Sequence, residues 1–354
     1  AGADVWMGDL DESYAPRPPL YDVIGAQLIR TLDIDLTQPA YERNPYDARG
    51  EPHSQGNKNA VLHAPDEGWP FRGTSLAVHV LRWFSLLCSA CTVVLTYILA
   101  LAVAPTRRSL AACAAALVAF NPQFLFVSAS VTNGTLATAL VTGTLLGCVR
   151  LLNGRADRWP SAVVLGLAAG AAALTDPIGL AAAALLLAAY AGWALLRRPR
   201  GERTDTAGRR VDRAVWISLA IALAVMLAMA AWWYVRQAAV VGVPSVVATS
   251  LEGAARADRL PWAEVLTRVR GAFISYWGVF GWMNVLADEF YYTLVHVLTI
   301  VGMVGALLFV VRVRWRAGEA QVSADRGRLS QALGNLLANA VEHGSGPIDV
   351  EVRR

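Results

Sequence analysis

Charged side chains are scarce in this chain of 354 residues: they make up 16% of it, against about 25% in an average soluble domain. They are absent from several long stretches, of which residues 214–234 are the clearest. Hydrophobic residues reach 55%, and the mean hydropathy is +0.41. A soluble fold could not bury that much apolar surface, so the composition argues against an ordinary soluble protein.

Cysteine is also scarce, and all four cysteines lie in apolar stretches: Cys88, Cys91, Cys113 and Cys148. Cys88 and Cys91 have the spacing of a redox or metal motif, but a dry membrane helix does not stabilise a thiolate. We therefore expect these side chains to pack rather than to react. A secretory signal is lacking as well, and because residues 1–74 are expected outside, we expect a leading transmembrane segment to be missing.

About seven apolar stretches are present, and most are long enough to cross a hydrocarbon layer about 30 Å thick. They cover residues 75–103, 110–127, 135–149, 161–174, 178–196, 214–234 and 291–311. Residues 167–196 can also be read as one broken helix. The sequence thus predicts an all-α polytopic membrane protein of about seven transmembrane helices, with two extracytoplasmic loop regions and a short α/β cytoplasmic tail fragment.

Arginine clusters lie between alternate apolar stretches: Arg107 and Arg108; Arg150, Arg155 and Arg158; residues 197–213; Arg312, Arg314 and Arg316. The positive-inside rule places all of them in the cytoplasm. Residues 1–74 and 236–290 then lie outside, and residues 312–354 form a cytoplasmic tail. The net charge of +4 is explained by these clusters and by anionic lipid, so we expect the lipid bilayer and no nucleic acid as a partner.

The two outer regions hold most carboxylates, histidines and interfacial tryptophans, so we expect the chemistry to be outside. Residues 22–32 have the apolar pattern of a helix lying at the membrane interface. Residues 262–273 suit a short helix, and the aromatic run that follows suits either an interfacial belt or a groove for a lipid substrate.

From residue 17 to about residue 316, several short motifs recur in the order found in one family. They are Arg17-Pro18-Pro19-Leu20-Tyr21, Asn44-Pro45-Tyr46, Asn57-Lys58-Asn59 with His63, residues 73–85, residues 119–124 followed by 128–131, residues 232–236 and residues 276–282. The chain resembles a bacterial GT-C membrane glycosyltransferase, in the branch of protein O-mannosyltransferases and lipid A sugar transferases. The chain departs from that pattern at several places. The family's first helix and the Asp-Glu pair after it are not recognisable. Asp22 replaces a second tyrosine, Asp176 stands where relatives commonly have a lysine, and Asn133-Gly134-Thr135 stands where relatives often have Asn-Asn-Asp.

The resemblance implies transfer of a sugar from a polyprenyl-phosphate carrier to an acceptor hydroxyl, in the inner (cell) membrane of a bacterium. A carboxylate of the first outer loop would act as the base, which corresponds to Asp9, Asp11 or Glu12. Cations would hold the leaving phosphate. The alternative for the three carboxylates is a solvated acidic loop.

Five further residues are candidates for substrate binding: Lys58, His63, His79, Arg82 and Arg236. His79 and Arg82 are ionisable groups in a membrane helix, which usually face a cavity or a partner; a structural hydrogen bond is the alternative. For Arg236 the alternative is contact with ordinary lipid headgroups. His53 and His63 share a loop with Asp47, Glu51, Asp66 and Glu67 and could bind a divalent cation, although their spacing matches no fixed ligand pattern.

The tail resembles a different family. Residues 325–344 match the N-box of a sensor histidine kinase ATP-binding domain, in which Asn335 and Asn339 would contact Mg²⁺ and phosphates. The glycine-rich boxes that complete such a site do not follow, so we expect a truncated fragment that does not bind nucleotide. A membrane glycosyltransferase is the function predicted; the alternatives are a membrane-anchored fragment of a sensor kinase and an inactive chimeric or truncated membrane protein.

Overall fold

The computed structural model describes residues 17–32, 34, 36, 42–46, 59, 61–63, 65–153, 158–196, 206–241, 262–281 and 285–317. These residues form an almost entirely helical structure with two small antiparallel strand pairs. The chain forms two compact units, Ala1–Glu289 and Phe290–Arg354. The coarser part of the expected fold class, an all-α membrane protein, is therefore confirmed.

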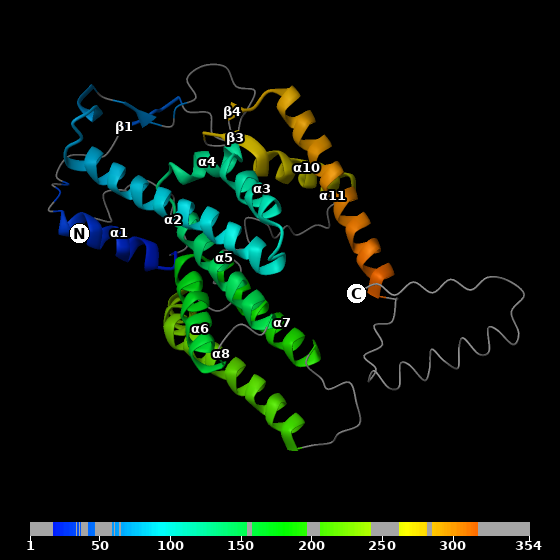
Figure 1. The fold of residues 1–354 in the computed structure, drawn as a ribbon. Helices are drawn as coiled ribbons and strands as arrows, with labels where there is room; N and C mark the ends of the chain where they lie inside the picture. Colours follow the sequence, from blue (N-terminus) through cyan, green and yellow to red (C-terminus); the bar gives the residue numbers. More distant parts are fainter. Residues whose placement is uncertain are drawn as a thin grey trace, which may run out of the picture. The chain divides into compact units, whose positions relative to one another are not determined.

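The elements of the first unit are α1 (Leu20–Thr31), β1 (Glu42–Arg43), β2 (Val61–Leu62), η2 (Pro65–Glu67), α2 (Gly73–Val103), α3 (Arg108–Ala119), α4 (Pro122–Ser128), α5 (Asn133–Leu152), α6 (Arg158–Thr175), η3 (Pro177–Leu180), α7 (Ala181–Leu196), α8 (Thr206–Val241), α10 (Trp262–Gly278), β3 (Val279–Phe280) and β4 (Val285–Leu286) (Figure 1). The helix α11 (Glu289–Ala317) makes up the described part of the second unit. β1 pairs with β2, and β3 pairs with β4.

Five helices among the described residues are long and apolar enough to cross a membrane: α2, α5, η3 with α7, α8 and α11. A sixth span is present if α3 and α4, which meet at a bend of 62°, count as one. The seventh expected span corresponds to α6, whose apolar part, Trp159–Thr175, is too short to be counted. At 1.5 Å per residue it measures about 25 Å, less than the hydrocarbon thickness of about 30 Å.

The bend between α3 and α4 follows from Asn121 and Pro122. Proline lacks an N–H group and disfavours helical geometry in the residue before it, so α3 ends at Ala119. Asn121 then caps α4, because its side-chain oxygen accepts a hydrogen bond from the Phe124 backbone N–H at 3.1 Å. The same logic ends α6 at Thr175: Asp176 precedes Pro177 and accepts from the Ile178 N–H at 2.9 Å. The break expected at this point is confirmed.

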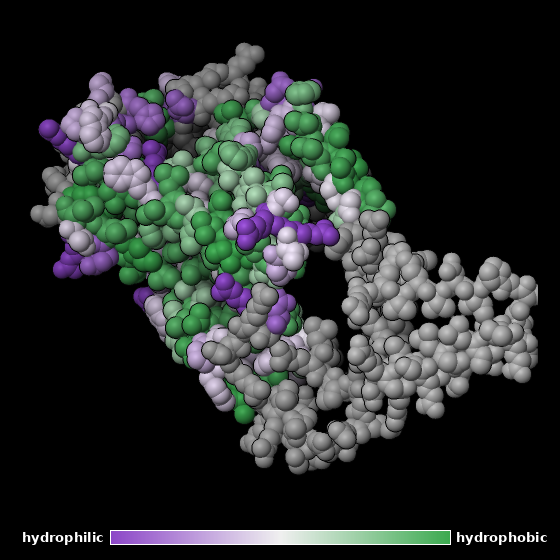
Figure 2. Space-filling view, in the orientation of Figure 1, coloured by the Kyte–Doolittle hydropathy of each residue, from purple (hydrophilic) through white to green (hydrophobic). Residues whose placement is uncertain are grey.

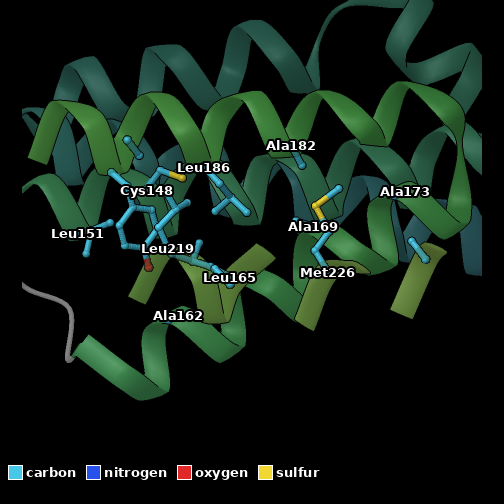
Figure 3. Close-up of a cluster of buried hydrophobic side chains, with 14 of the residues drawn as sticks. Cys148, Leu151, Ala162, Leu165, Ala169, Ala173, Ala182, Leu186, Leu219 and Met226 are labelled. Carbon is cyan, nitrogen blue, oxygen red and sulfur yellow. The ribbon is translucent and has the colours of Figure 1, made fainter. Parts of the chain in front are cut away.

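The core of the first unit lies between α5, α6, α7 and α8 (Figure 3). Alanines on α6, such as Ala162, Ala169 and Ala173, are fully buried and let the neighbouring helices approach closely. A methyl group added at Gly166 would lie 2.5 Å from the Ala222 carbonyl oxygen on α8. One added at Gly170 would lie 2.9 Å from the Met229 side chain. The helices α6 and α8 are thus packed almost backbone to backbone.

Hydrogen bonds from α5 define two ends of this bundle. At one end, Asn133 donates to the Thr175 carbonyl oxygen at 2.9 Å, so α5 begins where α6 ends. At the other end, Asn153 donates to the Ala102 carbonyl oxygen at 2.7 Å, so α5 and α2 finish together. We call these the Asn133 end and the Asn153 end. Therefore α2 and α5 run in the same direction, and α6 runs in the opposite one.

The surface of the first unit is hydrophilic at the two ends of the bundle and hydrophobic between them. In Figure 2 hydrophilic side chains gather around β1, β2 and the start of α2, and again at the turn between α2 and α3, with a hydrophobic surface between them. Large apolar side chains are exposed there, including Leu87, Val94 and Leu117. In water such a surface would drive aggregation, whereas lipid covers it at no cost.

Three helices extend well beyond their expected limits. The helix expected at 214–234 is α8, which runs from Thr206 to Val241, and the short helix expected at 262–273 continues as α10 to Gly278. The helix expected at 291–311 is α11, which runs from Glu289 to Ala317. The helix expected at 22–32 is confirmed as α1. The tail fragment with Asn335 and Asn339 lies outside the described residues.

Candidate functional site

Tyr21 connects three helices at the Asn133 end. Its phenol oxygen forms a 3.0 Å hydrogen bond with the Ser85 hydroxyl on α2, and the backbone of Thr132, the cap of α5, also interacts with it. Its ring lies 5.7 Å from that of Phe84. Gly25, one turn further along α1, leaves room for Leu81: a methyl group there would lie 2.9 Å from that side chain. The Pro-Pro-Leu-Tyr motif is therefore held on the first half of α2.

Burial changes the acidity of the tyrosine. Tyr21 is 5% exposed, and this desolvation raises the pKa of its phenol, although the hydrogen bonds with Ser85 and Thr132 oppose the effect. The phenol consequently stays neutral. It serves as a fixed hydrogen-bonding group rather than as a base.

Two other sequence motifs are joined at the bend between α3 and α4. The Asn121 side chain donates to the Tyr276 carbonyl oxygen at 3.2 Å, and the Val279 N–H donates to the Gln123 side chain at 2.8 Å. These partners are 155 and 156 residues apart in sequence. The rings of Phe126 and Phe280 meet edge to face at 5.6 Å. The asparagine of the 44–46 motif likewise donates to the Asn59 carbonyl oxygen, at 2.7 Å.

A third group of contacts holds the ends of α5, α6 and α8 together. Asn133 donates to the Asp176 carboxylate at 3.1 Å as well as to Thr175. The Tyr234 hydroxyl, near the end of α8, donates to the Ala173 carbonyl oxygen at 2.8 Å. Because Asp176 is held by an amide and a backbone N–H, it acts here as a structural cap.

Arg82 is the charged group of this end that lies closest to the membrane interior. It is half-buried, and its Nε atom is buried without a hydrogen-bond partner among the described residues. Ser85 and Ser89, three and seven positions further, lie on the same face of α2, and the buried Ser89 hydroxyl also lacks a partner in the described part of the chain. A buried guanidinium N–H costs free energy unless an acceptor meets it.

The position of Arg82 along α2 sets its depth in a membrane. The helix has 31 residues and is about 46 Å long, more than a hydrocarbon layer requires. Residues 83–103 carry no charged side chain and measure about 30 Å. A hydrocarbon layer that begins at Val103 would end next to Arg82, which is the charged residue that precedes this stretch.

The other predicted binding residues have different surroundings. His79, half-buried on α2, bonds through Nδ1 with the Ser75 carbonyl oxygen at 2.7 Å, and its ring stacks on Phe71 at 3.6 Å. His63 is exposed and lies 2.6 Å from the Glu67 carboxylate. Arg236 is exposed, with its guanidinium 6.0 Å from the centre of the Trp233 ring. Of these residues, His79 is the one that lies within one helical turn of Arg82.

Several predicted residues lie outside the described part of the chain: Asp9, Asp11, Glu12 and Lys58, together with the metal-ligand candidates Asp47, Glu51 and His53. Among the described residues, no group of three or more His, Cys, Asp or Glu side chains could hold a metal ion. The pair His63 and Glu67 is by itself too small a ligand set for a divalent cation.

In the sequence, Asp22 is recognisable only as a departure from the family motif, where it replaces a second tyrosine. Its side chain is open to solvent on one side, yet partial desolvation at the start of α1 raises the pKa of its carboxyl group, against the opposing charge of Arg17. The shift is in the direction that makes a carboxylate a stronger base. The signal in the sequence was an acid directly beside the tyrosine of the Pro-Pro-Leu-Tyr motif.

Comparison with known proteins found no match: no family model, no curated protein and no solved structure matches the chain. Function has to be argued from these residues and their geometry.

Replacing Tyr21 by Phe should destabilise the first unit by about 1–3 kcal/mol, because the Ser85 hydroxyl is fully buried and would lose its partner. Thermal unfolding of the detergent-purified protein measures this as a lower midpoint. The control is Tyr46→Phe, since Tyr46 is 84% exposed and should tolerate the same change. A double variant with Ser85→Ala should recover part of the loss; equal midpoints for Tyr21→Phe and the unmodified protein would contradict the role of this bond.

Proposed function

We propose that the chain is a membrane glycosyltransferase that moves a sugar from a polyprenyl-phosphate donor to an acceptor outside the membrane. The observation that carries the proposal is Arg82, a half-buried arginine at the edge of the hydrocarbon whose Nε lacks a partner among the described residues. A phosphate attached to a long apolar chain has the chemistry to fill this position. Its charge would meet the guanidinium while its tail remains in lipid.

The pairing of the motifs supports the same proposal. The segments that carry the resemblance are distant in sequence, yet they contact one another: Tyr21 with Ser85, Asn44 with Asn59, and Asn121 with Tyr276. A set of motifs that serve one site is expected to do this.

The roles follow from the chemistry of glycosyl transfer. A base removes the proton of the acceptor hydroxyl, whose oxygen attacks the anomeric carbon, and the bond from that carbon to the phosphate oxygen breaks. The polyprenyl phosphate leaves with the electron pair, and a cation stabilises its charge. We assign the cation to Arg82, supported by Lys58 and Arg236, and substrate contacts to His63 and His79. The base is one of Asp9, Asp11, Glu12 and the newly located Asp22.

The Asn133 end should face away from the cytoplasm in a bacterial cell membrane. Arg107, Arg108 and Arg150 lie at the Asn153 end, where the positive-inside rule expects them. By the same rule, Arg312, Arg314 and Arg316 near the end of α11 place the C-terminal tail in the cytoplasm.

Orientation can be measured by cysteine labelling in intact bacterial cells with a charged, membrane-impermeant maleimide. Ile178→Cys, at an exposed position of η3, should react at once, and Thr106→Cys should react only after permeabilisation. The unmodified chain is the control. Its four cysteines lie in apolar helices and should not react with the charged maleimide. Reaction of Thr106→Cys in sealed cells would reverse the topology.

Arg82→Gln should slow consumption of a polyprenyl-phosphate sugar by about 10²-fold or more, because the leaving phosphate loses its cation. The assay measures the rate of donor consumption in membranes that contain the full chain. Mannose, glucose and arabinose are tested as donor sugars. Arg30→Gln, an exposed arginine in the last turn of α1, is the matched control and should leave the rate unchanged. An unchanged rate in Arg82→Gln would contradict the role of Arg82, on which the proposal rests.

In the same assay, at least one of Asp9→Asn, Asp11→Asn, Glu12→Gln and Asp22→Asn should lose about 10²- to 10⁴-fold in rate, as expected when a general base is removed. The others should lose much less, because a single proton acceptor serves the reaction. Full rates in all four variants would show that the base lies elsewhere.

A further inference from the structure

Three rings form a ladder at the start of α2. The Trp69 ring lies edge to face with Phe71, with ring centres 5.5 Å apart and planes at 90°. Phe71 in turn stacks on His79 at 3.6 Å, with planes 15° apart. We call Trp69, Phe71 and His79 the aromatic ladder. Trp69 is 82% exposed, so most of its indole surface is open.

Two hydrogen bonds hold the aromatic ladder in place. The Ser75 hydroxyl donates to the Glu67 carbonyl oxygen at 3.1 Å and ties the loop of Trp69 to the first turn of α2. His79 Nδ1 lies 2.7 Å from the Ser75 carbonyl oxygen. Because a carbonyl oxygen only accepts, Nδ1 must carry the proton, which leaves Nε2 available to a ligand hydroxyl.

The ladder also lies directly outward of Arg82. His79 and Arg82 are three positions apart, on neighbouring parts of one helix face, and His79 is about 4.5 Å further from the hydrocarbon. Trp69 precedes the helix and is connected to His79 through the Phe71 ring, which lies at the level of His79. A donor whose phosphate meets Arg82 carries its sugar on the side away from the lipid tail, which is the side of the ladder.

We propose that the aromatic ladder binds the sugar of the lipid-linked donor; this inference rests on the proposed function and deepens it. A sugar ring has an apolar C–H face and a rim of hydroxyl groups. The exposed indole of Trp69 offers a flat apolar face for the first, with an N–H group at its edge. His79 Nε2 accepts a hydrogen bond from the rim.

An interfacial belt is the competing explanation for an exposed tryptophan. Trp262, the first residue of α10, provides a comparison, since it is 83% exposed and takes part in no ring contact among the described residues. The two tryptophans are equally exposed, but only Trp69 belongs to a stack that leads to Arg82. A belt would use both of them alike.

The test measures binding of short-chain ligands to the full chain in detergent by titration calorimetry. Farnesyl phosphate probes the Arg82 position alone, and farnesyl-phosphate mannose, glucose and arabinose add the sugar. At least one sugar should tighten binding by about three- to tenfold, the size of one aromatic stacking contact. Trp69→Ala should remove this gain and leave the affinity for farnesyl phosphate within about twofold. Trp69→Phe should retain most of the gain, and Trp262→Ala should change neither affinity.

The outcomes separate the two proposals. Absence of farnesyl phosphate binding, or equal binding by Arg82→Gln, would overturn the donor site and the ladder with it. Binding of farnesyl phosphate that no sugar tightens would overturn the ladder alone. So would a sugar gain that survives in Trp69→Ala, or an equal loss for every ligand in Trp69→Ala and Trp262→Ala, since both results describe a general anchor.

Discussion

The absence of water from the hydrocarbon layer is the constraint on which this structure depends. Every charge has to lie at an end of the bundle or meet a counter-charge, and every polar side chain inside has to find a partner. The threonines of α2 satisfy this locally: Thr92 and Thr96 donate to carbonyl oxygens one turn earlier. Among the described residues, the Arg82 Nε atom and the hydroxyls of Ser89 and Tyr190 are buried without a partner, and of these three residues Arg82 alone is charged. Because the Arg82 Nε has no partner among the described residues, it indicates an anion-binding position more directly than an arginine on the surface would.

The helical framework could be read from the sequence because it reflects single-segment properties. Long apolar stretches predicted α2, α5, α8 and α11, and Pro177 predicted the break at Asp176. The break at Asn121 is a correction, because the sequence suggests one apolar stretch over residues 110–127, which the structure divides between α3 and α4. The sequence predicts the number of membrane spans less well than it predicts the helices themselves. The helix α6 is short but fully apolar, and only its close packing against α8 shows that neighbouring helices, rather than lipid, surround much of it. Apolar composition does not distinguish these two environments.

The candidate site was less accessible to sequence reasoning. Motif order suggested which segments matter, but one sequence contains no information on pairing, so the contact between Asn121 and Tyr276 could not be predicted. Arg82 and His79 were singled out as ionisable groups in an apolar helix. Whether such a group has a partner is a property of three-dimensional packing, and here the two residues differ: His79 has a backbone partner and the Arg82 Nε has none in the described part of the chain.

The glycines of α6 determine which parts of the bundle are able to move. With Gly166 and Gly170 against the backbone and side chains of α8, these two helices have no slack between them and behave as one rigid body. The other side of the first unit is different, because α3 and α4 meet at a bend, and α10 is joined to them by side-chain hydrogen bonds and one pair of phenylalanines. Such contacts break and re-form at low cost. A movement within the first unit would then displace α4 and α10, while α6 and α8 keep their packing.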